Sequence, residues 1–378
     1  MKNRVNAKQQ PKRIGLKSTL VLASLAMTIS PAMAKTDWWK MSDKEFAETY
    51  ADQALSNDIT SQSKVAWMLF ARLNEQVPST GSSVSKWEMW PSNADTFSPG
   101  RAKFALNNKI RTRPHFGTTK AELLLRHFKN TPSSAGEERT RNMISYDYIR
   151  SNGLYTKVGV NKFLSSGKKA DFPIGATEIK AFWAHGKTSG AYVYFDEAQG
   201  VHYSLLGLHI MCKFKPAPKD PFTSEDPSWF WTTFEFKGNE GLTHAQSLLT
   251  YNDKLSVDQA TALLTEAGLG STAFVNYRSN GTQIRFTDKS NPKSILMGNT
   301  KMEAFAATPQ NTPPSQWTSW QTSCHTCHGS TAAKVSGQSV EFYPFRPIIV
   351  GKLTEANAPG LSEYSSLDFV WSIAFNAQ

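Results

Sequence analysis

The sequence predicts an α+β protein with N-terminal helices, a central antiparallel β-sheet region and a short C-terminal segment. Apolar residues recur at helical spacing between positions 42 and 73, whereas aromatic and β-branched residues dominate the runs between 172 and 236. The chain has 378 residues, of which 12% are aromatic. It is therefore long enough to bury one large core or two smaller ones.

The first helix is expected to begin near Ser42. Ser42 and Glu45 form a capping pattern, and Phe46, Tyr50 and Ala54 follow at helical spacing. Apolar periodicity predicts further helices over 65–73, 120–128 and 145–152. The Pro, Gly and Ser residues between 78 and 85 indicate a loop.

The central part of the chain has the composition of β-strands. Aromatic and β-branched residues are concentrated in four runs: 178–183, 191–195, 202–214 and 229–236. Residues 197–200 predict a turn between two of these runs. Neighbouring strands with short connections favour antiparallel pairing.

Two more elements are expected after the strands. Residues 258–267 predict a helix that ends at Gly268, and residues 274–286 predict a hairpin around Asn280-Gly281. Cys212 is expected to be buried, because Leu206, Leu208, Ile210 and Cys212 alternate along one strand face. No internal repeat and no phosphate-binding glycine loop is found in the sequence.

Residues 1–34 have the pattern of a secretory signal. A basic start is followed by the apolar run 19–27 and by the small-residue end Ala32-Met33-Ala34. Cleavage after Ala34 would remove six basic residues and no acidic one, so the formal net charge would fall from +11 to +5. This modest excess gives no support to nucleic-acid binding, although it would favour docking to an acidic partner. No later segment approaches the length of a permanent membrane span.

The motif that points to chemistry is Cys324-His325-Thr326-Cys327-His328, a C-x-x-C-H sequence of the kind that attaches haem c. In such a motif two thiols one helical turn apart form thioethers with the haem vinyl groups. The histidine then coordinates the iron. We therefore expect one haem c held by Cys324 and Cys327, with His328 as the proximal iron ligand.

Two other interpretations of the cysteines are disfavoured. A zinc site would need more ligands, and the only other cysteine is the distant Cys212. A thioredoxin-like dithiol would follow a strand, whereas residues 313–317 indicate a loop or short helical turn. Export and a haem c motif support one another, because the motif resembles that of c-type cytochromes, and this resemblance implies that haem is attached outside the bacterial cytoplasmic membrane. The periplasm is the expected compartment.

The sixth iron ligand is not given by the motif, because no Met or His follows His328. His209 is the first upstream candidate, since His209 and Met211 alternate with Leu208 and Ile210 along their strand. The alternative, which is the more common one in general, is a hydrogen-bonded histidine in a half-buried sheet. Met297 and Met302 are further candidates in a loop-like context, although methionine is also a common gap-filler. The other alternative is an iron that is open on one side.

An open iron would suggest chemistry on peroxide, nitrogen oxides or a small organic substrate, aided by an acid or base. Glu178 and Glu235 are the carboxylates considered for that role, with pairing to Lys180 or Lys237, or solvent exposure, as the alternative. Lys334 and Arg346 are candidates to pair with haem propionates, with solvent exposure as the more common alternative for such residues. The tail 366–371 is similar to the aromatic tail of the cytochrome c-prime beta class, whose distal haem face is open.

Several blocks of the sequence resemble a large, poorly characterised family of exported bacterial single-haem cytochromes c. The blocks that carry this resemblance are 66–74, 87–90, 178–180 with Trp183, 207–210 and 229–235. Phe236 departs from the pattern, because members of that family often have histidine after the glutamate. The resemblance adds to the expected organisation and does not imply a reaction.

Together these features predict a signal peptide over 1–34, an α+β body over 35–310 and a haem-bearing segment over 311–378 that packs on the body. The expected function is electron transfer with a redox partner protein. One alternative is an open-site haem oxidoreductase, which would bind a small molecule at the iron. The other is a haem-based gas sensor or accessory protein.

Overall fold

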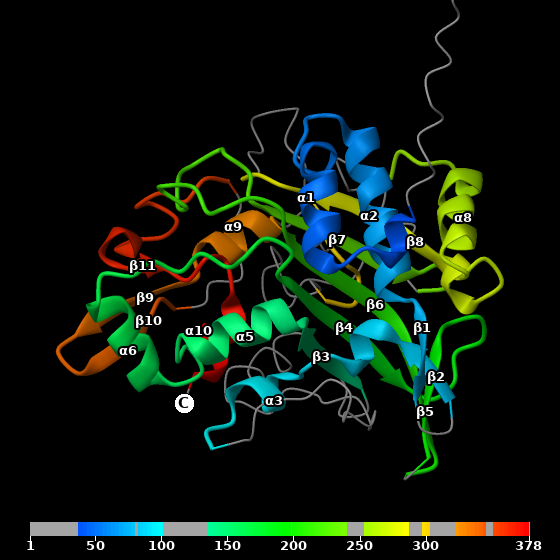
Figure 1. Ribbon diagram of the computed structural model, residues 1–378, viewed down its shortest axis with the longest axis horizontal. Coiled ribbons are helices and arrows are strands. Elements are labelled where there is room, and N and C mark those ends of the chain that lie inside the picture. Colours follow the sequence, from blue (N-terminus) through cyan, green and yellow to red (C-terminus); the bar gives the residue numbers. More distant parts are fainter. Residues whose placement is uncertain are drawn as a thin grey trace, which may run out of the picture. The chain divides into compact units, whose positions relative to one another are not determined.

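Figure 1 shows the computed structural model of the protein. The structure describes residues 37–79, 82–100, 135–197, 199–239, 253–286, 297–302, 323–344 and 351–377. Contacts divide the chain into Met1–Asp37 and Trp38–Gln378, and the second unit contains nearly all described residues. The predicted signal peptide, the predicted helix over 120–128, Arg346 and the loop 313–317 lie outside the described residues.

The predicted α+β class is confirmed. The α-helices are α1 (Asp43–Ala54), α2 (Ile59–Leu73), α3 (Asn93–Phe97), α5 (Met143–Ser151), α6 (Lys157–Ser165), α8 (Val257–Glu266), α9 (Cys324–Gly329) and α10 (Trp371–Asn376). Short 3-10 helices are η1 (Trp38–Lys40), η2 (Lys86–Met89), η4 (Ala273–Asn276) and η6 (Leu361–Glu363). The strands are β1 (Gln76–Ser79), β2 (Ser82–Ser85), β3 (Ala135–Arg141), β4 (Thr177–His185), β5 (Val193–Asp196), β6 (Val201–Lys213), β7 (Trp229–Phe236), β8 (Tyr277–Gln283), β9 (Ala332–Ser336), β10 (Ser339–Phe342) and β11 (Ser365–Ser366).

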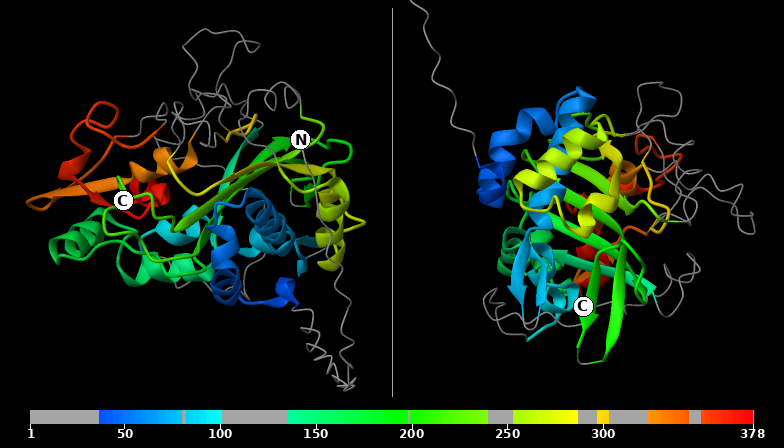
Figure 2. Two further views of the ribbon diagram at one scale, coloured as in Figure 1. Left: turned by 90° about the horizontal axis from the view of Figure 1, so that it is seen from above. Right: turned by 90° about the vertical axis from the view of Figure 1, so that its right-hand side faces the viewer.

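The central sheet has the strand order β3-β4-β6-β7-β8, and β5 pairs with β6. Every pairing in this sheet is antiparallel, as predicted. Helices α1, α2 and α8 cover one face of the sheet (Figure 2). On this face Phe70 of α2 stacks on Phe234 of β7 with ring centroids 4.1 Å apart.

The opposite face of the sheet supports the C-terminal part of the chain. Trp229 and Trp231 of β7 and Met211 of β6 form a second apolar cluster with Phe369 and with residues of α5, α6 and α10. Cys324 of α9 packs against the same cluster. A small sheet with the order β10-β9-β11 follows α9. The C-x-x-C-H helix therefore lies on the sheet face opposite α1, α2 and α8.

Helix boundaries follow side-chain caps. Ser42 accepts a hydrogen bond from the Glu45 amide and begins α1, as predicted. Helix α2 begins six residues before the predicted 65–73 segment, because Asp58 accepts the amides of Thr60 and Ser61 and caps a first turn made of polar residues. Helices α5 and α8 lie at their predicted positions, and Gly268 follows α8 with a φ of +78°.

The prediction of a hairpin at Asn280-Gly281 is wrong, because both residues lie within the single strand β8. Thr232 pairs with Thr282 and Phe234 with Ser279, so Asn280 and Gly281 stand opposite Thr233 alone as a β-bulge. Gly281 has a φ of +112°, which suits glycine. The bulge aims the Asn280 amide at Glu235 rather than turning the chain.

The predicted loop over 78–85 is also wrong, because β1 and β2 form a two-stranded antiparallel sheet there. Val77 pairs with Val84, and Pro78 lies in a sheet that has no further strand. Both strands are edges, so Pro and Ser residues are tolerated within them.

Cys212 is buried on β6 beside Leu208 and Ile210, as predicted. Leu206 departs from that alternation because the register between β4 and β6 shifts at this point, where Gly207 pairs with Phe182 and Leu205 with Trp183. Burial raises the pKa of the Cys212 thiol to about 12, so this thiol is protonated at neutral pH. Among the described residues no helix is both long and apolar enough to cross a membrane.

Replacing Phe70 with alanine should lower the free energy of unfolding by about 3–5 kcal/mol, because it leaves a cavity where the ring stacks on Phe234. Urea denaturation monitored by circular dichroism would measure the change. Val158→Ala is the control, because Val158 is 64% exposed and its truncation should change stability by less than about 0.5 kcal/mol. Equal losses in both variants would contradict the proposed packing.

Candidate functional site

Helix α9 presents the three motif side chains on one side. Ser323 caps the helix by accepting the Thr326 amide at 3.1 Å. Cys324, Cys327 and His328 are each partly exposed, whereas His325, Thr326 and Gly329 are buried. Positions three and four apart share a helix face. The two thiols and the imidazole therefore lie on the same, partly exposed side of α9, where Cys324 also packs against the apolar cluster that contains Trp231.

Three contacts from other segments hold α9 in place. Gln283 at the end of β8 accepts the His325 amide at 2.8 Å. The Thr326 hydroxyl donates to the Gly351 carbonyl at 2.6 Å, and the Trp371 indole donates to the Cys327 carbonyl at 3.0 Å. A helix of six residues would not be stable alone, so these tertiary contacts set its position.

The His328 imidazole is oriented by the backbone of the C-terminal segment. Its Nδ1 lies 2.7 Å from the carbonyl oxygen of Phe369. Because a carbonyl can only accept, the proton of this hydrogen bond must reside on Nδ1. The neutral imidazole then has a lone pair on Nε2, which is the form that binds a metal ion.

The Phe369 carbonyl belongs to a backbone turn of unusual conformation. Asp368 and Phe369 have φ values of +53° and +68°, the left-handed region that residues other than glycine rarely adopt. Each such residue costs about 1–2 kcal/mol, which is tolerated only where the surroundings hold the turn. The turn is followed directly by α10.

Asp368 is the residue that holds this turn. Its buried carboxylate accepts the Phe172 amide at 2.7 Å and the Trp229 indole N–H at 3.0 Å. The ammonium group of Lys213, also fully buried, lies 2.5 Å from the same carboxylate and 3.0 Å from Asp171. Burial raises the pKa of Asp368, and the Lys213 ammonium opposes that rise.

His325, between the two motif cysteines, is part of the core. Its ring packs against Trp231, Phe286 and Phe369 with centroids 5.0, 4.5 and 4.8 Å away. Burial lowers the pKa of His325 to about 3, so the ring is neutral at physiological pH. The His325 ring therefore acts as a packing group that ties α9 to Trp231 of β7.

The candidates for a sixth iron ligand lie on the same sheet face as α9. Met211 pairs with Trp231, whose ring centroid lies 6.1 Å from that of His328. His209 lies two residues before Met211 on the same strand, so its side chain is on the same face. Met297 is fully buried in the apolar cluster that contains Trp231 and packs against Cys324. Met302 packs instead on Phe182 and over Gly207.

The two carboxylates considered as acid or base have structural contacts. Glu178 pairs with the buried Arg141 at 3.1 Å and accepts the Ser372 hydroxyl at 2.9 Å, so the suggested pairing with Lys180 is wrong. Lys180 pairs instead with Glu137.

Glu235 is buried and accepts four hydrogen bonds, from the Thr300 amide and hydroxyl, Asn280 and Asn239. Lys237 donates to the Val275 carbonyl instead of pairing with Glu235. Pairing with Lys237 and solvent exposure are therefore both wrong for Glu235. The carboxylate joins β7 to β8 and to the 297–302 segment.

Lys334 pairs with Glu341 and Glu363 at 3.4 and 3.3 Å. Its ammonium also lies over the Tyr364 ring. These contacts connect the small sheet to η6. The Lys334 ammonium, which the sequence suggested as a partner for a haem propionate, is therefore already paired with two carboxylates.

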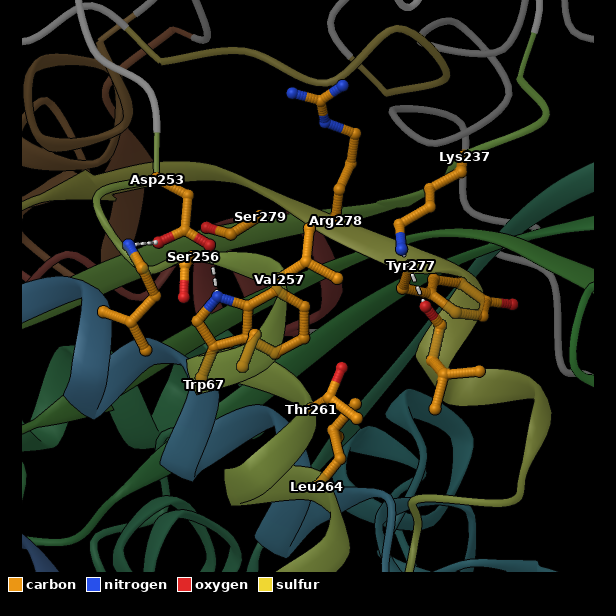
Figure 3. Close-up of a pocket in the computed structure, with 13 residues that line it drawn as sticks. Trp67, Lys237, Asp253, Ser256, Val257, Thr261, Leu264, Tyr277, Arg278 and Ser279 are labelled. Carbon is orange, nitrogen blue, oxygen red and sulfur yellow. Dashed lines mark hydrogen bonds between the residues drawn. The ribbon is translucent and has the colours of Figure 1, made fainter.

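A separate cavity of about 260 Å³ lies on the other face of the sheet (Figure 3). It is bounded by α8, β8 and Trp67 of α2, with Lys237 and Asp253 on its rim. The guanidinium of Arg278 points away from Val257 and Thr261. The Asp253 carboxylate accepts the Trp67 indole N–H and the Leu255 amide. This cavity is not continuous with α9, because the sheet lies between them.

The donor set of α9 fits a covalently attached haem. Two thiols and one Nε2 lone pair share a partly exposed side of this helix. None of the three cysteines forms a disulfide. No protein-family model, curated protein or solved structure matches this chain.

No role in this site was predicted for four residues: Trp231, Asp368, Phe369 and Lys213. Trp231 lies in the block 229–235, and Asp368 and Phe369 lie in the tail 366–371, both of which the sequence singled out only by resemblance. Asp tolerates the left-handed region better than most residues, but that preference gives no indication of which turn uses it. The alternation of Trp229 and Trp231 predicts a shared face without showing that α9 packs there.

Replacing Glu235 with glutamine should lower the free energy of unfolding by about 1–3 kcal/mol. The amide NH₂ cannot accept the hydrogen bonds that the carboxylate receives, so buried donors lose their partner. Urea unfolding would measure this loss, with Glu197→Gln, at an exposed position in the turn after β5, as the matched control. If Glu235→Gln is as stable as Glu197→Gln, Glu235 has no structural role of this kind.

Proposed function

We propose that this protein is an exported c-type cytochrome that carries a single haem and acts in electron transfer. The observation that carries this proposal is the hydrogen bond from His328 Nδ1 to the Phe369 carbonyl, on a helix that presents Cys324 and Cys327 on the same side. This bond gives His328 the tautomer needed in a proximal ligand.

Each motif residue has a defined role in this proposal. Cys324 and Cys327 hold the haem through thioethers, and His328 Nε2 coordinates the iron. The haem supplies a one-electron couple between ferric and ferrous iron. The Phe369 carbonyl increases the basicity of His328, and the half-buried surroundings of α9 set the local polarity; both influence the reduction potential.

Electron transfer is favoured over catalysis by the contacts of the acidic residues. Glu178 is paired with Arg141, and Glu235 accepts four hydrogen bonds, so neither is poised to exchange a proton with a bound substrate. Met297 lies in the apolar cluster that Cys324 packs against, and His209 lies on the same sheet face. In a haem-loaded protein, Met297 or His209 would supply the sixth iron ligand from this face, and a redox partner protein would be the physiological reactant.

Export is supported by the sequence of residues 1–34 and by the cysteine content. The basic start, apolar run and Ala32-Met33-Ala34 end have the order of a signal peptide. The periplasm is the compartment where the proposed haem attachment would occur. Cys212 is compatible with that oxidising compartment, because it is buried and its thiol is protonated.

Thiol counting tests the proposed thioethers. When the protein is produced with periplasmic haem-maturation machinery and then denatured, an alkylating reagent should modify Cys212 alone, because thioether sulfurs do not react. The native protein should not react at Cys212, which is buried. The Cys324→Ser/Cys327→Ser variant is the matched control and should contain no covalent haem after denaturation. Three reactive cysteines in the denatured wild type would refute the proposed function.

Spectroscopy of single-residue variants tests the coordination. Absorption and electron paramagnetic resonance spectra should show low-spin iron in the wild type. Conversion to high-spin iron is expected in only one of His209→Gln and Met297→Leu, whichever removes the sixth ligand. Met302→Leu is the control, because Met302 packs on Phe182 and should leave the spectrum unchanged. A high-spin wild type that binds cyanide promptly would contradict electron transfer and support an open-site oxidoreductase or gas sensor.

A further inference from the structure

We propose that Asp368 is a positioning residue for the proximal histidine. It holds the left-handed turn of Asp368 and Phe369 so that the Phe369 carbonyl meets His328 Nδ1 at 2.7 Å. The hydrogen bonds of the Asp368 carboxylate go to Phe172, Trp229 and Lys213, so it acts on His328 through the backbone of the next residue. This inference rests on the proposed function, because it gives Asp368 a role in setting the reduction potential.

The contacts of Asp368 define where the turn lies. Its carboxylate accepts three hydrogen bonds: from the Phe172 amide, from the Trp229 indole of β7 and from the Lys213 ammonium at the end of β6. These groups come from three separate segments of the body. The carboxylate is fully buried, so solvent cannot replace any of the three donors. The turn is therefore anchored to the central sheet through the Asp368 carboxylate, in addition to the packing of the Phe369 ring on His325 of α9.

The same sheet also fixes α9. Trp231, two residues after Trp229 on β7, packs against the rings of His325, His328 and Phe369. Strand β7 thus positions both partners of the hydrogen bond: the imidazole through Trp231 and the carbonyl through Trp229 and Asp368. Loss of the Asp368 anchor would remove the polar contacts that set the direction of the Phe369 carbonyl, whereas the rings of Phe369 and His328 would stay packed on Trp231.

Substituting asparagine for Asp368 removes contacts of the carboxylate but keeps a residue that tolerates the left-handed backbone conformation. Asparagine has the same size and tolerates the left-handed region, so the turn itself stays accessible. It carries no charge to pair with the buried Lys213. Its one amide oxygen can replace only one of the two carboxylate oxygens, so the NH₂ group faces either the Trp229 indole or the Phe172 amide and cannot accept from it. The Phe369 carbonyl should then move from His328 Nδ1.

The test is the reduction potential of the haem-loaded full chain, measured by spectroelectrochemical titration. Asp368→Asn should have a more positive potential than the wild type, because a weaker hydrogen bond at Nδ1 makes His328 less basic and stabilises ferric iron less. Trp229→Phe keeps an aromatic ring and removes one donor to Asp368, so its potential should shift in the same direction by a smaller amount. If Asp368→Asn does not fold, the Trp229→Phe variant tests the positioning role by itself.

Glu88→Gln is the matched control. Glu88 is a fully buried carboxylate that accepts the Ser85 amide and the Tyr192 hydroxyl in the core on the other side of the sheet. Its substitution makes the same chemical change and should lower the melting temperature without moving the potential. A potential for Asp368→Asn and Trp229→Phe equal to that of the wild type, or a shift of the same size in Glu88→Gln, would overturn the positioning role.

Failure of the proposed function would be recognised separately, because the wild type would then carry no covalent haem. In that case ¹⁵N chemical shifts of the His328 ring in the full chain decide the positioning role. A proton on Nδ1 in the wild type and a mixture of tautomers in Asp368→Asn would support it. Identical tautomers in the two proteins would overturn it.

Discussion

Strand β7 is buried along its whole length, and the rest of the structure depends on its two faces. Phe230 and Phe234 face the helices α1, α2 and α8, whereas Trp229 and Trp231 face the C-terminal segment. A strand that is buried on both faces has no solvent side, so nearly every substitution along it changes a packed surface. This constraint connects the stability of the helical layer to the position of α9.

Buried polar groups supply the directional contacts that apolar packing lacks. Lys213, Arg141, Glu235 and Asp368 are all buried, and each is bonded to groups from more than one segment. Removing one member of such a network leaves the others unsatisfied, which costs more than the bond itself contributes. The networks thereby favour one relative placement of the strands and the loops over near alternatives.

The sequence was sufficient to predict elements whose signal is local. The Ser42 cap, the 258–267 helix, the aromatic strands and the burial of Cys212 depend on spacing and composition within about ten residues, and the structure has all of them. Asn280-Gly281 was misinterpreted because the dipeptide favours a turn locally, whereas pairing with β7 converts it to a bulge. The Asp368 anchor could not be predicted, because its donors lie 139, 155 and 196 residues away along the chain.

The two cysteines of the motif are close together in the sequence, whereas the two partners of the His328 hydrogen bond are far apart. Cys324 and Cys327 are held together by one turn of chain, whereas the Phe369 carbonyl is 41 residues from His328. Closing a loop of that length costs on the order of 3 kcal/mol in chain entropy before any contact compensates for it. In the proposed cytochrome, covalent capture of the haem therefore needs only a local segment and is compatible with an unfolded chain. The orientation of the iron ligand, in contrast, is a property of the completed fold.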